Sequence, residues 1–95
     1  MKPYEKHEIE KLLGELTHWS LTPDSKKIFR AYTFTDFVGS IHFVNQVADV
    51  AEVEGHHPDI HIFYNKVLIE LWTHSVGGLT ENDFIVAAKI DAIWK

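Results

Sequence analysis

The strongest restriction on the fold comes from two runs of β-branched and aromatic residues that lie only two residues apart. The runs cover residues 60–64 and 67–74, and Asn65-Lys66 lies between them. A two-residue connection joins antiparallel strands, and Asn tolerates the positive φ that tight hairpin turns require. The sequence therefore predicts a β-hairpin in this part of the chain.

A second pair of extended segments lies earlier in the chain. Trp19 and Leu21 alternate with polar residues, and alternation returns over residues 27–34. The intervening segment 22–25, Thr-Pro-Asp-Ser, has the composition of a turn. These segments predict two further antiparallel strands.

Apolar residues at helical spacing fill most of the remaining sequence. Helices are predicted over about residues 4–16, from a cap at Thr35 or Asp36 to near Gly55, and from about Glu81 to Ala92. In the middle helix, the stripe expected to face the core consists of Phe37, Ile41, Val44, Ala48 and Ala51, and Val38, Val47 and Val50 widen it.

The order helix, strand, strand, helix, strand, strand, helix predicts the α+β class. Hairpins joined in this way give a four-stranded antiparallel sheet with three helices on one face. We expect a single domain over residues 1–95. Because the other face of the sheet is left uncovered, we also expect a homodimer or a homotetramer.

Composition excludes several classes of function. The net charge is -5 and no long basic run occurs, which argues against direct binding of nucleic acid. No apolar run approaches the ~18 residues of a spanning helix, and the charged first residues do not resemble a signal peptide, so we expect a cytoplasmic protein without a membrane partner. Since cysteine is absent, the chemistry must come from histidine, acidic residues, tyrosine or backbone.

The stretch EGHHPDIH at residues 54–61 places three of the seven histidines close together. Pro58 disfavours a helical conformation at His57, which argues against a helical pair of metal ligands. If the hairpin pairs symmetrically about Asn65-Lys66, His57 and His74 end side by side, and His56 shares the same pocket mouth. From spacing alone, an acid–base site, a metal site and unremarkable surface histidines all stay open.

Two carboxylates and two indoles are further candidates. Glu52 precedes His56 by one helical turn and could orient its ring. Asp83 could accept a hydrogen bond at the site or, with Thr80, cap the last helix. Trp19 and Trp72 could form a flat wall for an aromatic ligand or belong to the core.

The spaced series Glu52-x3-His56-His57-Pro58-x5-Tyr64-x9-His74-x8-Asp83 resembles the signature of the pterin-4a-carbinolamine dehydratase family. The stretches YTFTDF, YNKV and GLTENDF are also similar to the family pattern, and the resemblance covers roughly residues 8–93. Two positions depart from it: Trp72 stands where a small polar residue is usual, and Ser75 stands where an acidic residue is frequent.

The resemblance implies a hydro-lyase, a 4a-hydroxytetrahydrobiopterin dehydratase that forms quinonoid dihydropterin and water without a metal or another cofactor. It implies catalytic His56, His57 and His74, with His56 and His74 transferring protons and His57 orienting the ring. Glu52 and Asp83 would support the histidines. The pterin would be bound by the histidines together with Gly55, Trp72, Thr73, Ser75 and Trp19.

Family resemblance also implies dimers or tetramers, and the animal homologues bind a homeodomain transcription factor. The alternative function is therefore a small homo-oligomeric binding module, or dimerisation cofactor of a regulatory protein, with a vestigial pocket.

Overall fold

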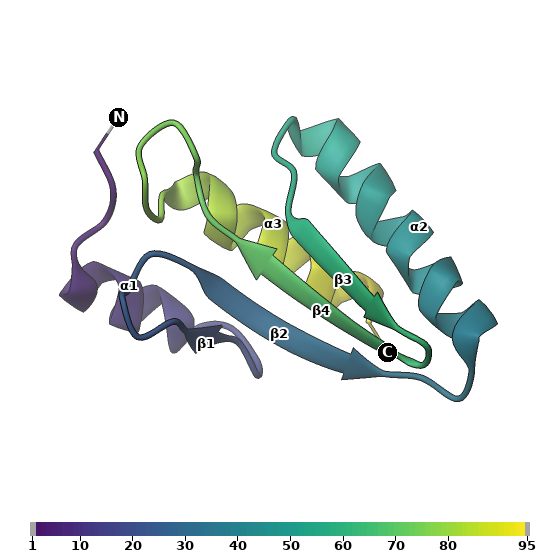
Figure 1. Cartoon of the computed structure of the whole chain (residues 1–95). Helices are drawn as coiled ribbons and strands as arrows, with labels where there is room; N and C mark the ends of the chain where they lie inside the picture. Colours follow the sequence, from purple (N-terminus) through teal and green to yellow (C-terminus); the bar gives the residue numbers. More distant parts are fainter. Residues whose placement is uncertain (1, 95) are drawn as a thin grey trace.

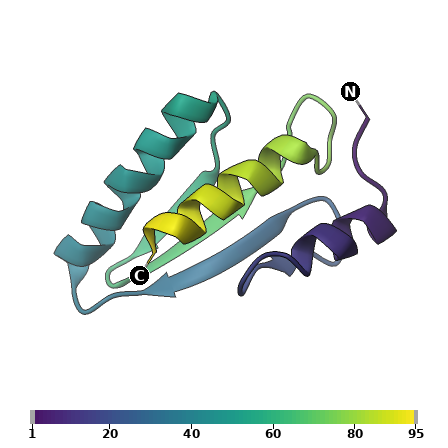
Figure 2. The same cartoon turned by 180° about the vertical axis from the view of Figure 1, so that it is seen from behind.

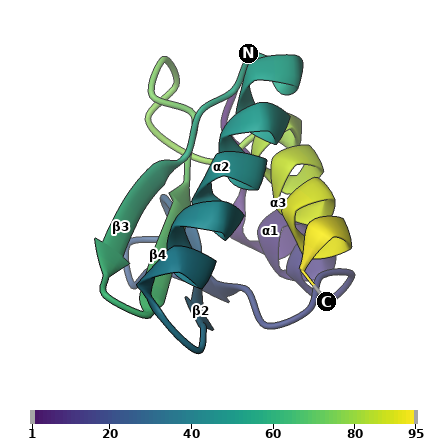
Figure 3. The ribbon, with the colours of Figure 1, turned by 90° about the vertical axis from the view of Figure 1, so that its right-hand side faces the viewer.

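The computed structural model describes residues 2–94 and contains the seven elements in the predicted order (Figure 1). Four strands form one antiparallel sheet in the order β1-β2-β4-β3. All three helices lie on the same face of this sheet (Figures 2 and 3), which confirms the predicted α+β fold. The elements are α1 (Lys6–Leu13), β1 (Ser20–Leu21), β2 (Ile28–Thr33), α2 (Phe37–Glu54), β3 (Asp59–Phe63), β4 (Lys66–Leu71) and α3 (Glu81–Ile93).

The core lies between the helices and the inner face of the sheet. Side chains of β2 and β4 alternate between this face and the outer one, as their period of two requires. Burying each large apolar side chain contributes about 1.5–3 kcal/mol to folding. The buried apolar side chains of the two strands are Ile28, Tyr32, Val67, Ile69 and Leu71.

Within residues 2–94, no helix is both long and apolar enough to cross a bilayer.

The hairpin forms as predicted, but its turn lies one residue earlier. Phe63 pairs with Lys66, and Tyr64 rather than Asn65 takes the left-handed conformation, with φ of 52°. Asn65 is held outside the ladder because its carbonyl accepts from the Phe34 N–H at 2.7 Å and its side-chain amide donates to the Phe34 carbonyl at 3.1 Å. The symmetric pairing of His57 with His74 was therefore wrong, since β4 ends at Leu71 before His74 is reached.

Helix α2 begins and ends where the capping residues predict. The Asp36 carboxylate accepts from the Gly39 N–H at 2.8 Å, and Gly55 ends the helix with φ of 64°. The predicted core stripe was wrong in part, because Phe37 is 49% exposed and Ala48 is exposed. Apolar residues occur on several sides of α2, so contact with the sheet and α3 selects the buried face: Ser40, Phe43, Val47 and Ala51.

Helix α1 is shorter than the predicted 4–16. Glu5 and Glu8 form a capping box in which the Glu8 carboxylate accepts from the Glu5 N–H at 2.9 Å, so the helix begins after Glu5. Gly14 ends it. Helix α3 begins at the predicted Thr80–Asp83 capping box and ends at Ile93, one residue beyond the prediction.

Candidate active site

One pocket brings the predicted histidines together. It lies where α2 passes into β3 and where β4 leaves the sheet toward α3, at the end opposite the hairpin turn (Figure 1). Its volume is about 430 Å³. Two segments, residues 55–59 and 72–75, thus contribute to a single site. The lining residues are Gly55, His56, His57, Pro58, Asp59, Trp72, Thr73, His74 and Ser75.

His56 and Asp83 form a largely buried pair. Their Nε2 and Oδ1 atoms are 2.6 Å apart, and the side chains are 14% and 0% exposed. Gly55 ends α2 immediately before His56, and an ion pair between Glu54 and Lys89 at 2.5 Å joins the end of α2 to α3. The fold therefore holds the imidazole against the first turn of α3.

The Asp83 carboxylate accepts two further hydrogen bonds, both at Oδ2. The Thr73 hydroxyl donates at 2.8 Å and the Thr80 backbone N–H donates at 2.9 Å. Thr80 in turn donates its hydroxyl proton to the Thr73 oxygen at 2.8 Å. These donors and the positive end of α3 stabilise the negative charge of a carboxylate that no water reaches. Asp83 therefore both caps α3 and fixes His56.

The Asp83 contact decides which nitrogen of His56 can meet a ligand. An ionised carboxylate only accepts hydrogen bonds, so the proton between the two side chains belongs to Nε2 of His56. Nδ1 is the remaining ring nitrogen. It can accept a proton in the neutral ring or donate one in the imidazolium form.

Glu52 contacts His57 and not His56, which corrects the expected pairing. His57 Nε2 donates to Glu52 Oε2 at 2.5 Å, and the two side chains are 61% and 76% exposed. The expected spacing required α2 to continue through His56, but the helix ends at Glu54. His56 leaves the helical path there, and the next histidine folds back toward Glu52.

The indole of Trp72 forms a wall of the pocket. Its ring lies 4.0 Å from the His74 ring, centroid to centroid, at an angle of 33°. Its Nε1 donates to Asp59 Oδ2 at 3.2 Å, and the Lys27 ammonium lies 4.9 Å from its centroid. These contacts fix one side of His74. Asp59 was not among the predicted site residues, although an antiparallel hairpin places it diagonally opposite Trp72.

Trp19 does not reach this pocket. It is 7% exposed, and its Nε1 donates to Asp91 Oδ1 at 2.9 Å, beside the Arg30 guanidinium, which contacts the same oxygen at 2.8 Å. Asp91 lies eight residues beyond Asp83, which is about 12 Å along a helix. In this structure Trp19 therefore belongs to the core.

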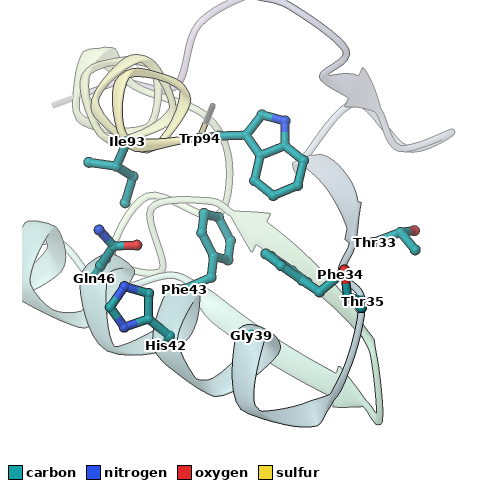
Figure 4. Close-up of a pocket in the computed structure, with 9 residues that line it drawn as sticks. All are labelled: Thr33, Phe34, Thr35, Gly39, His42, Phe43, Gln46, Ile93 and Trp94. Atoms are coloured by element: carbon teal, nitrogen blue, oxygen red, sulfur yellow. The ribbon is translucent and has the colours of Figure 1, made fainter.

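A second hollow of about 490 Å³ lies between the end of β2, α2 and the end of α3. Figure 4 shows the rings of Phe34, Phe43 and Trp94 gathered there, and His42 is the one titratable group of its lining.

Possible metal ligands converge elsewhere within residues 2–94. The side chains that come close enough together to share an ion are Glu5, His7 and Glu8, which are far from the histidine pocket in sequence. The histidine pocket differs from both places, because two of its lining histidines, His56 and His57, each contact a carboxylate.

Similarity to known proteins covers nearly the whole chain. A family model described as "Pterin 4 alpha carbinolamine dehydratase" matches residues 2–93. A protein of Rickettsia bellii, named "Putative pterin-4-alpha-carbinolamine dehydratase", is 47% identical over 91 residues, which are 96% of this chain and 80% of that protein. "Pterin-4-alpha-carbinolamine dehydratase 2, mitochondrial" of Arabidopsis thaliana is 48% identical over 86% of this chain and 46% of its own length.

Two solved structures are also similar. A crystal structure of a "transcriptional coactivator/pterin dehydratase" from Brucella melitensis superposes with a TM-score of 0.93 at 34% identity, over 99% of this chain and 100% of that one. A pterin dehydratase-like protein described as a RuBisCO assembly factor has a TM-score of 0.67 at 23% identity, over 80% of this chain and 88% of that one, and shows the shared fold alone.

Proposed function

Since this chain belongs to the pterin-4a-carbinolamine dehydratase family, we propose that it dehydrates 4a-hydroxytetrahydropterins, such as 4a-hydroxytetrahydrobiopterin, to quinonoid dihydropterins. The observation that carries the proposal is the single pocket in which the His56–Asp83 pair, His57 and His74 meet. The reaction needs one group that gives a proton and one that takes a proton, and imidazoles perform both tasks near neutral pH.

The reaction breaks the C4a–O bond of the pterin and forms a double bond between C4a and N5. The electron pair comes from N5, an acid delivers a proton to the departing hydroxyl, and a base removes a proton from a ring nitrogen. One water molecule leaves, and the pterin is neither oxidised nor reduced by the enzyme. Two imidazoles, one that gives a proton and one that takes a proton, therefore account for every proton in the reaction. The proposal accordingly includes no metal and no other cofactor.

His56 and His74 are the proposed proton-transfer groups. Nδ1 of His56 is available to the ligand while Nε2 is held by Asp83 at 2.6 Å. An imidazolium that forms at His56 is stabilised by the buried carboxylate, as in other histidine–aspartate pairs. His74 is exposed on one side and stacked on Trp72 on the other, so it can exchange protons with water between turnovers.

His57 is proposed to orient the pterin rather than to transfer a proton. It lies at the exposed rim, where its ring is tethered by Glu52 on the last turn of α2. Trp72 offers a flat surface beside the histidines, and the backbone of Gly55 and residues 73–75 supplies polar groups to the ring edge. The hydroxyl of Thr73 is engaged with Asp83, so only its backbone is assigned to the ligand.

Measurement of water loss tests the proposal directly. Freshly generated 4a-hydroxytetrahydropterin is followed by ultraviolet absorbance with wild type, His56→Ala and His74→Ala, each with and without a chelator. We expect acceleration by wild type and rates reduced by about 10²-fold or more in both variants, since each removes a proton-transfer group.

His61→Ala is the matched control. His61 lies on β3 of the same hairpin, outside the pocket lining, where its ring contacts Glu70 at 2.7 Å on the exposed face of the sheet. Its removal is expected to leave the rate unchanged. Wild type that does not exceed the buffer rate would refute the dehydratase proposal, and loss of the rate on chelation alone would favour a metal site.

A role as a binding module is the second candidate. It is supported by the solved Brucella relative, which is described as a "transcriptional coactivator/pterin dehydratase". Self-association as a homodimer or homotetramer is part of both candidates, because β3 is an edge strand whose Ile62 and Phe63 are 38% and 62% exposed. Light scattering during size-exclusion chromatography measures the assembly, and a strictly monomeric chain would refute this part.

A further inference from the structure

The first residues of the chain lie against the loop that carries His74. Figures 1 and 2 show the N-terminal segment beside the connection between β4 and α3. The Tyr4 N–H donates to the Leu79 carbonyl at 2.7 Å, and the Tyr4 ring packs on Phe84 with centroids 6.1 Å apart. Phe84 follows Asp83 directly in α3. Two elements that frame the pocket thus share contacts with the N-terminus.

Gly78 marks the tightest of these contacts. A Cβ atom at this buried position would lie 2.9 Å from Cβ of Pro3, which is closer than two carbon atoms can approach. The backbone of Gly78 is not in the left-handed region, so its conformation alone does not require glycine. Close packing against Pro3 accounts for the absence of a side chain.

Direct contacts continue from Gly78 to the proposed catalytic pair. The Thr73 N–H donates to the Gly78 carbonyl at 2.9 Å, which closes the base of the loop over residues 74–77. The Thr73 hydroxyl donates to Asp83 at 2.8 Å, and Asp83 contacts His56 at 2.6 Å. Gly78, Thr73 and Asp83 are all buried, and His56 is partly buried. A displacement of the Gly78 backbone is therefore passed to packed neighbours, although Pro3 on the other side of the contact is exposed and can also move.

We propose that Pro3 and Tyr4 form a brace that positions the loop of His74 and, through Thr73, the Asp83–His56 pair. Neither residue lines the pocket, so the brace acts on the geometry of the proton-transfer groups and not on the ligand. Its effect is expected in kcat, with KM little changed. Only this kinetic consequence rests on the proposed dehydratase function.

Gly78→Ala tests the brace because the added methyl group must displace Pro3 or the loop. We expect kcat to fall about tenfold, below the roughly 10²-fold that a 1 Å misplacement of reacting groups can cost. Pro3→Gly in the same chain removes the opposing Cβ, and we expect it to restore kcat to within about threefold of wild type, as coupled neighbours do in a double-mutant cycle.

Two controls separate this contact from general effects of the substitutions. Gly14→Ala adds the same methyl group at the exposed end of α1, where the backbone is right-handed, and should leave kcat unchanged. Pro3→Ala keeps the Cβ atom, so together with Gly78→Ala it should not restore activity. Equal recovery with Pro3→Ala and Pro3→Gly would overturn the assignment of the contact.

Nuclear magnetic resonance of ¹⁵N-labelled histidine provides a readout that needs no substrate. The Nε2–H resonance of His56 reports its hydrogen bond to Asp83, and we expect it to shift and broaden in Gly78→Ala and to recover with Pro3→Gly. An unchanged resonance in folded Gly78→Ala would overturn the brace even if the chain dehydrates pterins. A changed resonance in a chain without activity would uphold the brace while refuting the dehydratase.

Deletion of residues 2–4 is the second variant, for the case in which Gly78→Ala does not fold. Glu5 and the capping box of α1 remain in this chain, so the helix can still form. We expect the same change in the His56 resonance and about a tenfold lower kcat. A folded deletion variant with the wild-type resonance and kcat would overturn the proposal.

Discussion

Two adjacent histidines each pair with a carboxylate, yet the surroundings of the pairs are opposite. His56 and Asp83 are separated by 2.6 Å and are 14% and 0% exposed, whereas His57 and Glu52 are separated by 2.5 Å and are 61% and 76% exposed. Water and salt screen the second pair, but not the first. Similar distances therefore do not imply similar energies, and the buried pair holds its ring in a fixed orientation more strongly than the exposed pair.

The supports of the two carboxylates explain this contrast. Asp83 lies in the first turn of α3 and accepts from Thr73 and Thr80 as well as from His56, so its position is fixed from three sides. Glu52 extends from the exposed side of α2, and its hydrogen-bond partner within the described chain is His57. Removal of each carboxylate should therefore have very different consequences.

Asp83→Asn should have the largest effect. It leaves a neutral amide among three donors, so the Thr73 hydroxyl, the Thr80 N–H or His56 loses its acceptor. We expect a loss of about 3 kcal/mol in the free energy of unfolding, as for other broken buried pairs. The dehydration rate should fall by about 10²-fold because His56 is no longer held in one tautomer. Urea denaturation and the absorbance assay measure the two effects.

Thr80→Ser is the matched control for this prediction. It retains the backbone N–H that donates to Asp83 and a hydroxyl for Thr73, so rate and stability should stay close to wild type. An Asp83→Asn variant with the wild-type rate would show that the carboxylate serves the helix cap alone.

Asp91→Asn should affect stability without affecting activity. Asp91 is 18% exposed and pairs with Arg30 at 2.8 Å, with Trp19 donating to the same oxygen, but none of these side chains lines the histidine pocket. We expect about 2 kcal/mol lower free energy of unfolding, the usual contribution of a hydrogen bond to a charged group. Urea denaturation measures this loss. A fall in kcat as large as the roughly 10²-fold expected for Asp83→Asn would contradict the placing of Asp91 outside the active site.

Tyr32 makes the cluster around Asp91 sensitive to alkali. Burial raises the pKa of the Tyr32 hydroxyl well above its ordinary value of 10.0, and Asp91 raises it further while Arg30 opposes the shift. The unfolded chain loses this proton near pH 10, but the folded chain retains it. The associated stability is therefore present below pH 10 and is lost as the pH rises above it, by about 1.4 kcal/mol per pH unit.

Urea denaturation at several alkaline pH values checks the Tyr32 prediction, with Tyr32→Phe as the control. The variant has no hydroxyl to ionise, so its stability should decline less steeply above pH 10 than that of wild type. Equal slopes for both chains would contradict the assignment.

The sequence was sufficient for the order of elements and for the caps of α2 and α3, because these depend on local spacing. The resemblance to the family supplied most residues of the pocket, but it also included Trp19, which lies in the core, and it did not include Asp59. Hairpin register was not predicted, since the contacts of Asn65 with Phe34 arise between strands that are distant in sequence. The partner of His56 could not be predicted for the same reason. Whether α2 continues through His56 decides between Glu52 and Asp83, and Gly55 decides it through its own conformation.

Glu52→Gln should have the smallest effect of the series. The amide can still accept from His57, and the lost charge is exposed, so the free energy of unfolding should change by about 0.5 kcal/mol or less. Weaker tethering of His57 should raise KM a few-fold and leave kcat unchanged, because His57 orients the ligand in our proposal. The difference from wild type should shrink as salt rises, since exposed charges are screened within about 10 Å at 0.1 M ionic strength.

Steady-state kinetics at low and high salt distinguish the two pairs most sharply when Glu52→Gln and Asp83→Asn are measured together. The Asp83 defect should persist at every salt concentration, because no solvent reaches that carboxylate. If Glu52→Gln lowered kcat as strongly as Asp83→Asn, and did so at high salt, His57 would have to transfer a proton. The two adjacent histidines would then have to exchange their proposed roles.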